Sequence, residues 1–173
     1  MDLKKHIRAI PDWPKKGIIF RDITTLIQNP EALHHSIDVF KKRYLDKDIN
    51  KVVGIEARGF IFGALIAYEL KLPFVIVRKP NKLPPPVDKM EYELEYGKDA
   101  IEISKGSIEK GDKVLIVDDL VATGGTLKAT IDLVEKHGGE VHELACVIDL
   151  PEVRVKDKLK DYPIFKLVDF EGG

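Results

Sequence analysis

Short runs of apolar residues recur along the chain and predict the strands of a buried sheet. The run from Val114 to Val117 has no polar interruption and is rich in β-branched residues, which is typical of a strand covered on both faces. The same criterion predicts strands over residues 52–55, 74–77, 113–117, 141–148 and 164–168. Residues 92–96 and 100–103 instead alternate apolar and polar positions around residues 97–99, and this alternation predicts a hairpin.

Apolar residues at helical spacing precede and separate these strands. At the start, Leu3, Ile7 and Ile10 share one helical face, and Pro11 ends the pattern. Asn29 is in the position of a helix cap, with a proline and an acid directly after it. Helices are therefore expected over residues 3–10, from residue 30, over about 59–70, and from residue 127 to the glycines at 138–139. Because helices alternate with strands over short connections, we expect an α/β fold with a central, mostly parallel sheet flanked by helices.

Length and composition limit the class of protein. The 173 residues contain no repeat, no low-complexity tract and no long linker, so a single domain over residues 1–173 is expected. No apolar run approaches the roughly 20 residues that span a bilayer, and the start lacks a secretory apolar segment, so no membrane partner is expected. The 28 basic and 29 acidic residues balance to a net charge of −1, which gives no long-range attraction to nucleic acid. The single cysteine, Cys146, excludes an internal disulfide and suits a cytoplasmic location.

The segment from Val114 to Thr126 carries the clearest chemical signal. The predicted strand leads into two adjacent acids, Asp118 and Asp119, and a turn rich in glycine and threonine then precedes a helix. The N–H groups of such a turn and the positive end of the helix dipole bind phosphate, and the hydroxyls of Thr123 and Thr126 are further donors. Two carboxylates would repel a phosphate, so they must bind ribose hydroxyls or a magnesium ion. These residues predict a site for a sugar phosphate.

A second turn, at residues 56–60, repeats this arrangement after the strand over 52–55. It contains Glu56 and Arg58, and in a parallel sheet it would lie at the same carboxyl edge as the first turn. A surface ion pair between these two residues, worth under about 1 kcal/mol, is the alternative interpretation. Basic residues also follow the strand over 74–77, where they form either a second contact for an anion or a solvated loop. These residues are Arg78, Lys79 and Lys82.

The run from Val114 to Thr126 resembles the 5-phosphoribosyl-1-pyrophosphate (PRPP) motif of type I phosphoribosyltransferases, because strand, paired acids and T-G-G-T occur in that order. The resemblance implies that Asp118 and Asp119 hold the ribose diol. It also implies that the following loop surrounds the 5′-phosphate through Ala122, Thr123, Gly124, Gly125 and Thr126. The run E-A-R-G-F at 56–60 matches the pyrophosphate loop of the adenine phosphoribosyltransferases, which gives Arg58 a catalytic role at the pyrophosphate. The pattern R-K-x-x-K-L-P adds Arg78, Lys79 and Lys82 as pyrophosphate contacts.

Two further segments resemble parts of the same family. Residues 1–28 contain P-D-W-P and G-I-I-F-R-D-I-T, which are similar to the family's segment for recognising the base. This implies that the backbone of Ile19 and Arg21 hydrogen-bonds adenine while Phe20 stacks on it. Residues 79–104 are similar to a β-hairpin lid, although Pro84-Pro85-Pro86 replaces a sequence in which the family usually has glycine. Periodicity does not choose among the hairpin's glutamates, but the run L-E-Y-G implies that Glu95 transfers a proton on the purine.

The resemblance implies a type I phosphoribosyltransferase fold and transfer of the phosphoribosyl group from PRPP to adenine, giving AMP and pyrophosphate in purine salvage. Magnesium would arrive with PRPP, since no preformed metal site is visible among the scattered histidines. The family also implies a homodimer. The alternatives are a transferase for hypoxanthine, guanine or orotate, and a non-catalytic regulator that senses PRPP. A P-loop nucleotidase is excluded because Asp112 occupies the position of the essential lysine.

Overall fold

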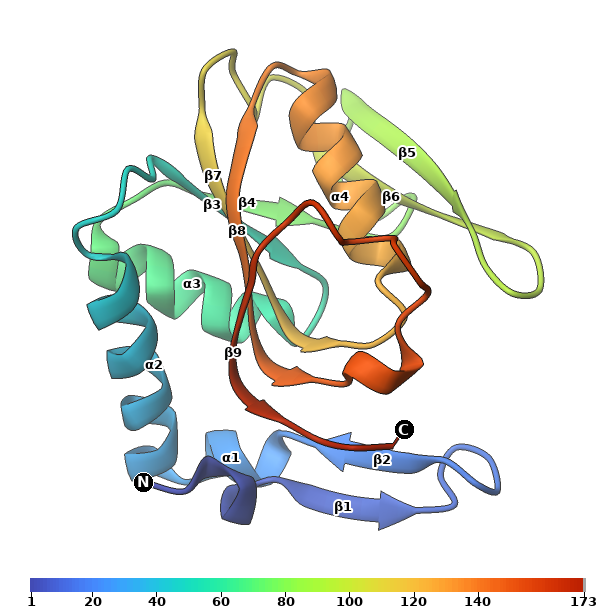
Figure 1. The fold of residues 1–173 in the computed structure, drawn as a ribbon. Coiled ribbons are helices and arrows are strands. Elements are labelled where there is room, and N and C mark those ends of the chain that lie inside the picture. The colour runs from blue at the N-terminus through green and yellow to red at the C-terminus, as the bar shows by residue number, and fades with distance from the viewer. Residues whose placement is uncertain (173) are drawn as a thin grey trace.

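The computed structural model describes residues 1–172, and its centre is a five-stranded sheet (Figure 1). The strands pair in the order β4-β3-β7-β8-β9, and every neighbouring pair is parallel. Their bounds are β3 (Lys51–Ile55), β4 (Phe74–Val77), β7 (Lys113–Val121), β8 (Glu140–Asp149) and β9 (Ile164–Asp169). The predicted strands and the parallel sheet are thus confirmed. Strand β7 is longer than predicted, however, so Asp118 and Asp119 lie within it and not after its end.

Helices cover both faces of this sheet. Helices α2 (Pro30–Tyr44) and α3 (Gly59–Leu70) lie on one side, and α4 (Gly125–Lys136) lies on the other (Figure 1). Successive residues of a strand point to opposite faces, and each face accordingly packs into its own apolar cluster. Leu115 packs on the side of α2 and α3, and Ile116 packs on the side of α4. The cap at Asn29 is confirmed, because its side chain accepts a hydrogen bond from the N–H of Ala32 at 3.0 Å.

The first segment of the chain differs from the prediction. A short 3₁₀ helix, η1 (Leu3–His6), is followed by β1 (Arg8–Pro11), which pairs antiparallel with β2 (Ile19–Asp22). The predicted helix through Ile10 is therefore wrong. Leu3 and Ile7 are buried as expected, but Ile10 lies in a strand opposite Phe20, because pairing with β2 satisfies backbone groups that a helix would have bonded internally. A helix that the sequence did not indicate, α1 (Thr24–Gln28), connects β2 to α2.

The predicted hairpin is present with a different register. Its strands, β5 (Val87–Glu93) and β6 (Lys98–Ser104), are antiparallel and lie over α4 (Figure 1). The turn is at Leu94–Gly97, where the N–H of Leu94 donates to the Gly97 carbonyl at 2.9 Å, and not at residues 97–99. Gly97 takes a φ of +100°, which glycine adopts without steric cost. Glu95 and Tyr96 consequently occupy the tip of the hairpin.

After β8, a second 3₁₀ helix, η2 (Pro151–Val153), leads into a turn-rich segment that returns the chain to β9. No helix formed by residues 1–172 has the length and apolar character needed to cross a membrane.

Candidate active site

The turn between β7 and α4 forms a small hollow at the carboxyl edge of the sheet. Gly124 caps α4 with a φ of +90°, a left-handed value that opens the turn. The first N–H groups of a helix have no acceptor within it, so those of α4 are directed at the hollow. Its volume is about 130 Å³, and its lining consists of Asp118 and residues 120–127. The residues predicted to surround a phosphate, Ala122 to Thr126, are therefore brought together.

The paired acids lie beside this hollow and contact a cation from another turn. Asp119 is buried, and its N–H donates to the Asp118 carboxylate at 2.8 Å. Arg58 donates from Nε to Asp119 Oδ2 at 2.5 Å. Burial, and then the neighbouring Asp119, raise the pKa of Asp118 well above its usual value. Burial alone would lower the pKa of Arg58, but the combined attraction of Asp119, Asp118 and Asp22 outweighs it and the pKa is raised. The two turns thus meet at one edge, as the sequence predicted.

Gly59 allows this close approach. A Cβ at this position would lie 2.9 Å from Asp118 Oδ1 and 3.0 Å from the Val117 carbonyl oxygen. The Asp118 carboxylate could rotate away, but the Val117 carbonyl and the Asp118 Cα, at 3.1 Å, belong to the backbone of β7 and cannot withdraw without displacing it, so only glycine lets α3 begin against this strand. The residue directly before it, Arg58, is fixed beside the acids by the same contact.

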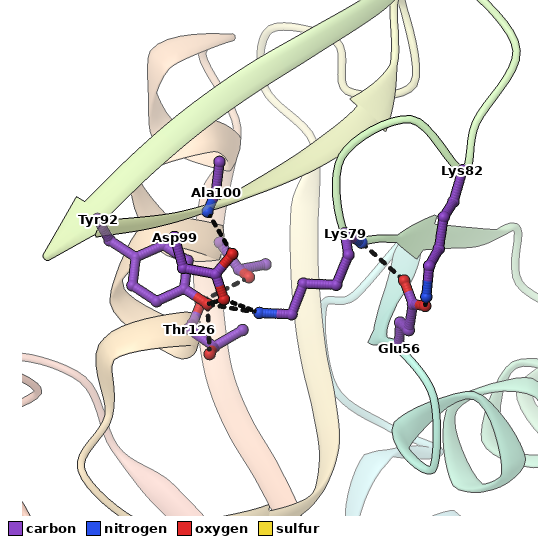
Figure 2. A network of polar contacts seen from close by, with 8 residues as sticks. Glu56, Lys79, Lys82, Tyr92, Asp99, Ala100 and Thr126 are labelled. Atoms are coloured by element: carbon purple, nitrogen blue, oxygen red, sulfur yellow. Dashed lines mark hydrogen bonds and ion pairs between the residues drawn. The ribbon is translucent and has the colours of Figure 1, made fainter. Parts of the chain in front are cut away.

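Two of the basic residues after β4, Arg78 and Lys82, direct their side chains to Glu56. Lys82 pairs with one carboxylate oxygen of Glu56 (Figure 2). Arg78 Nε lies 3.5 Å from the other oxygen. The backbone N–H of Lys79 also donates to Glu56, at 2.7 Å. Burial opposes the charge of Glu56, but these donors outweigh it and hold its pKa below the usual value. The proposed surface pair of Glu56 with Arg58 is therefore wrong, since each residue has a different partner.

A second network joins the hairpin to the phosphate turn. Lys79 Nζ pairs with Asp99 and donates to the Tyr92 hydroxyl at 2.8 Å (Figure 2). That hydroxyl lies 3.0 Å from Asp99 Oδ2 and 3.2 Å from Thr126 Oγ1. Lys79 holds the pKa of Asp99 below its usual value. The sequence analysis missed Tyr92 and Asp99 as site residues. Their only sequence signal was a place on the predicted hairpin, which does not reveal that they face Thr126.

An apolar pocket lies on the other side of Arg58. Its volume is about 320 Å³, and Phe20 and Trp13 form one wall with their rings edge to face at 4.5 Å between centroids. The guanidinium of Arg58 lies 5.8 Å from the centre of the Phe20 ring. The pocket also includes Ile10, Asp22 and Thr24. Of these residues only Phe20 and Arg58 were predicted, because the antiparallel pairing that brings Ile10 opposite Phe20 was not anticipated.

Ile19 and Arg21 present their backbone at one edge of β2. Alternate residues of an antiparallel strand direct their N–H and C=O groups to the same edge, so these two residues act together. The residues opposite them on β1 are Pro11 and Ala9.

Glu95 is placed apart from that pocket. It lies at the exposed hairpin turn and lines a cleft of about 790 Å³ together with Thr123, Gly125 and Thr126. The lining of the cleft also includes Val155 and Lys158. The structure thus brings Glu95 toward the phosphate turn but not to Phe20.

Within residues 1–172 no group of three or more His, Cys, Asp or Glu side chains is arranged to hold a metal.

Comparison with known proteins gives a consistent result. Residues 22–173 match the family model described as the phosphoribosyl transferase domain. The chain is 55% identical to an adenine phosphoribosyltransferase of Desulfosudis oleivorans, over 99% of both chains. It superposes on the crystal structure of adenine phosphoribosyltransferase from Thermoanaerobacter pseudethanolicus with a TM-score of 0.93 and 45% identity, covering 98% of both chains. The structure of the Saccharomyces cerevisiae enzyme, solved with an imino-altritol bisphosphate and adenine, superposes with a TM-score of 0.88. It is 36% identical in sequence, and the match covers 96% of this chain and 97% of the yeast chain.

The Tyr92 network predicts how firmly the hairpin is held. Tyr92→Phe removes the hydroxyl between Lys79, Asp99 and Thr126, so the free energy of unfolding should fall by about 1 kcal/mol. Amides of β5 and β6 should also exchange faster with deuterated solvent. Tyr96→Phe is the matched control, because Tyr96 is 88% exposed. Equal stability and equal exchange in the two variants would show that the network does not hold the hairpin.

Proposed function

This chain belongs to the phosphoribosyltransferase family, and we propose that it transfers the 5-phosphoribosyl group of PRPP to adenine, giving AMP and pyrophosphate in purine salvage. One observation carries the proposal: Arg58 contacts Asp119 beside the phosphate hollow and also lines the aromatic pocket. A phosphate, a sugar and a flat base can therefore bind in a row along this edge. The relatives named above support adenine as the base.

The acids and the loop bind PRPP in this proposal. The loop over residues 122–126 holds the 5′-phosphate, and Asp118 and Asp119 accept hydrogen bonds from the ribose diol. Breaking the bond at the anomeric carbon gives the sugar oxocarbenium character, as in glycoside cleavage. The departing pyrophosphate gathers negative charge, which Arg58 and the cations after β4 stabilise. All four of these cations are paired with acids in this structure, so pyrophosphate would replace carboxylate partners.

The pocket beside Phe20 binds the base. Phe20 stacks on the purine face, and its aromatic contact with Trp13 fixes the ring. The Ile19 carbonyl accepts from the amino group of adenine, and the Arg21 N–H donates to the adjacent ring nitrogen. A 6-oxo purine has no donor for that carbonyl, and a buried acceptor left unpaired costs about 1–3 kcal/mol. The preference for adenine follows from this difference.

In this proposal Glu95 acts as a general acid or base that transfers a proton on the purine. Since Glu95 lies across the cleft from the phosphate turn, the hairpin must close over the bound substrates to bring it to the base. Closure also excludes water that would hydrolyse PRPP.

Magnesium fits the acid pair. Adjacent carboxylates and phosphate oxygens are hard donors of the kind that Mg²⁺ binds, and a nearby dication favours the charged form of Asp118, which burial and Asp119 disfavour. Bound with PRPP, the ion would offset charge on the pyrophosphate. Asp118 and Asp119 are the residues that would contact it.

We also propose that the enzyme is a cytoplasmic homodimer. Helix α3 is apolar on nearly all sides, with Glu69 as its only charged residue, yet it exposes Ala64 and Tyr68. A helix apolar on all sides is normally buried, so a second copy of the chain is suited to cover it. Sedimentation should give twice the chain mass of 19.5 kDa, and Tyr68→Asp should shift the measured mass toward that of the monomer.

The buried free thiol of Cys146 supports the cytoplasmic location, because such a thiol suits a reducing compartment.

A substrate panel tests the function directly. PRPP is incubated with adenine, hypoxanthine, guanine or orotate, with Mg²⁺ and with excess chelator, and nucleotide formation is followed by absorbance. We expect AMP with adenine and Mg²⁺, hypoxanthine slower by up to about 100-fold, and loss of activity with chelator. Tight PRPP binding without turnover on any base would instead identify a regulator.

The role of Glu95 has its own test. Glu95→Gln should lower kcat by roughly 10²- to 10⁴-fold, because an amide cannot exchange the proton. The thermal midpoint should stay unchanged, since the side chain is exposed at a turn. Glu91→Gln, an equally exposed glutamate of the same hairpin, is the control and should keep full activity. A Glu95→Gln variant with wild-type kcat would remove Glu95 from the mechanism.

A further inference from the structure

The segment after η2 is built against the phosphate turn. The N–H of Val155 donates to the Thr123 carbonyl at 3.2 Å, and the N–H of Lys158 donates in turn to the Val155 carbonyl at 3.2 Å. Leu159 is 3% exposed and packs on Gly124, where a Cβ would lie only 3.0 Å from Leu159 Cδ1. One backbone bond and one apolar contact therefore fix this segment to the turn.

These contacts direct the side chain of Lys158 across the start of α4. A Cβ at Gly124 would lie 3.7 Å from Lys158 Cδ, and a Cβ at Gly125 would lie 3.9 Å from Lys158 Nζ. Lys158 also lines the same cleft as Thr123 and Thr126. Its ammonium group thus shares the cleft with the two hydroxyls predicted to contact phosphate.

The ammonium charge of Lys158 has no ion-pair partner among the residues that the structure describes. Each cation assigned to pyrophosphate already pairs with an acid. In contrast, no carboxylate of residues 1–172 lies within the 4.0 Å of an ion pair from Lys158 Nζ. Residues 122–126 contribute no charged side chain. Because a cation near the positive end of a helix is unfavourable, its placement here indicates an anion that binds to both.

We propose that Lys158 is a binding residue for the 5′-phosphate of PRPP and of AMP, and that it supplies the ammonium charge that the loop lacks. This inference rests on the proposed function. The loop amides and hydroxyls orient the phosphate, while the flexible lysine stem follows it as the cleft closes. The competing role is an ion pair with Glu93 or Glu95, which line the same cleft.

The test compares ligands that differ only in the phosphate. Lys158→Met should weaken AMP binding about tenfold, the loss expected for one solvent-accessible charge-assisted hydrogen bond, and should leave adenosine binding unchanged. The KM for PRPP should rise by a similar factor while the KM for adenine stays constant. Lys158→Arg should restore most of the AMP affinity. Lys160→Met is the matched control, because Lys160 is exposed on the same segment outside this cleft.

Each outcome separates the inference from the function on which it rests. A wild-type protein that forms no AMP overturns the proposed function. An active wild type together with a Lys158→Met variant that binds AMP normally overturns the assignment of Lys158 alone. Equal weakening of AMP and adenosine also overturns it, because a lysine that acts only through the hairpin glutamates does not distinguish the two ligands.

Discussion

Parallel pairing between β3 and β7 is the constraint on which the site depends. It aligns Gly54 with Val117, so the chain leaves both strands at the same edge. Arg58, in the turn after β3, then meets Asp119 near the end of β7, and Gly59 permits the contact by having no side chain to displace β7. The pairing of β4 with β3 adds the basic residues at that edge. The site is therefore formed by turns from several strands, which the pairing of the sheet brings to one edge.

The acids of the site are already paired with its cations when no anion is bound. Glu56, Asp99 and Asp119 each hold a cation, which limits the cost of burying charge in the free protein. In the proposed function, a polyanionic substrate competes with these carboxylates as well as with water. Its affinity would then depend on a difference between two sets of ion pairs, whereas the turn over residues 122–126 has no charged side chain to exchange.

The sequence predicted the central sheet, the three long helices and the place of the phosphate turn, because apolar runs and glycine positions are local signals. It failed where pairing between distant segments decides the structure. Ile10 has helical spacing but lies in β1, since β2 is available to pair with it. Tyr92 reads as one apolar position of a hairpin, and only the packing of that hairpin on α4 brings its hydroxyl to Thr126. The true hairpin turn depends on the register of β5 and β6, which alternation alone does not fix.

The place of Trp13 has a spectroscopic consequence. It is the chain's only tryptophan, it is half in contact with solvent at 51% exposure, and its ring meets Phe20 at the pocket assigned to the base. A purine bound against Phe20, as proposed, would change the polarity around this one indole. The chain would then carry its own fluorophore beside the base, and occupancy of that pocket could be followed by emission with no added label.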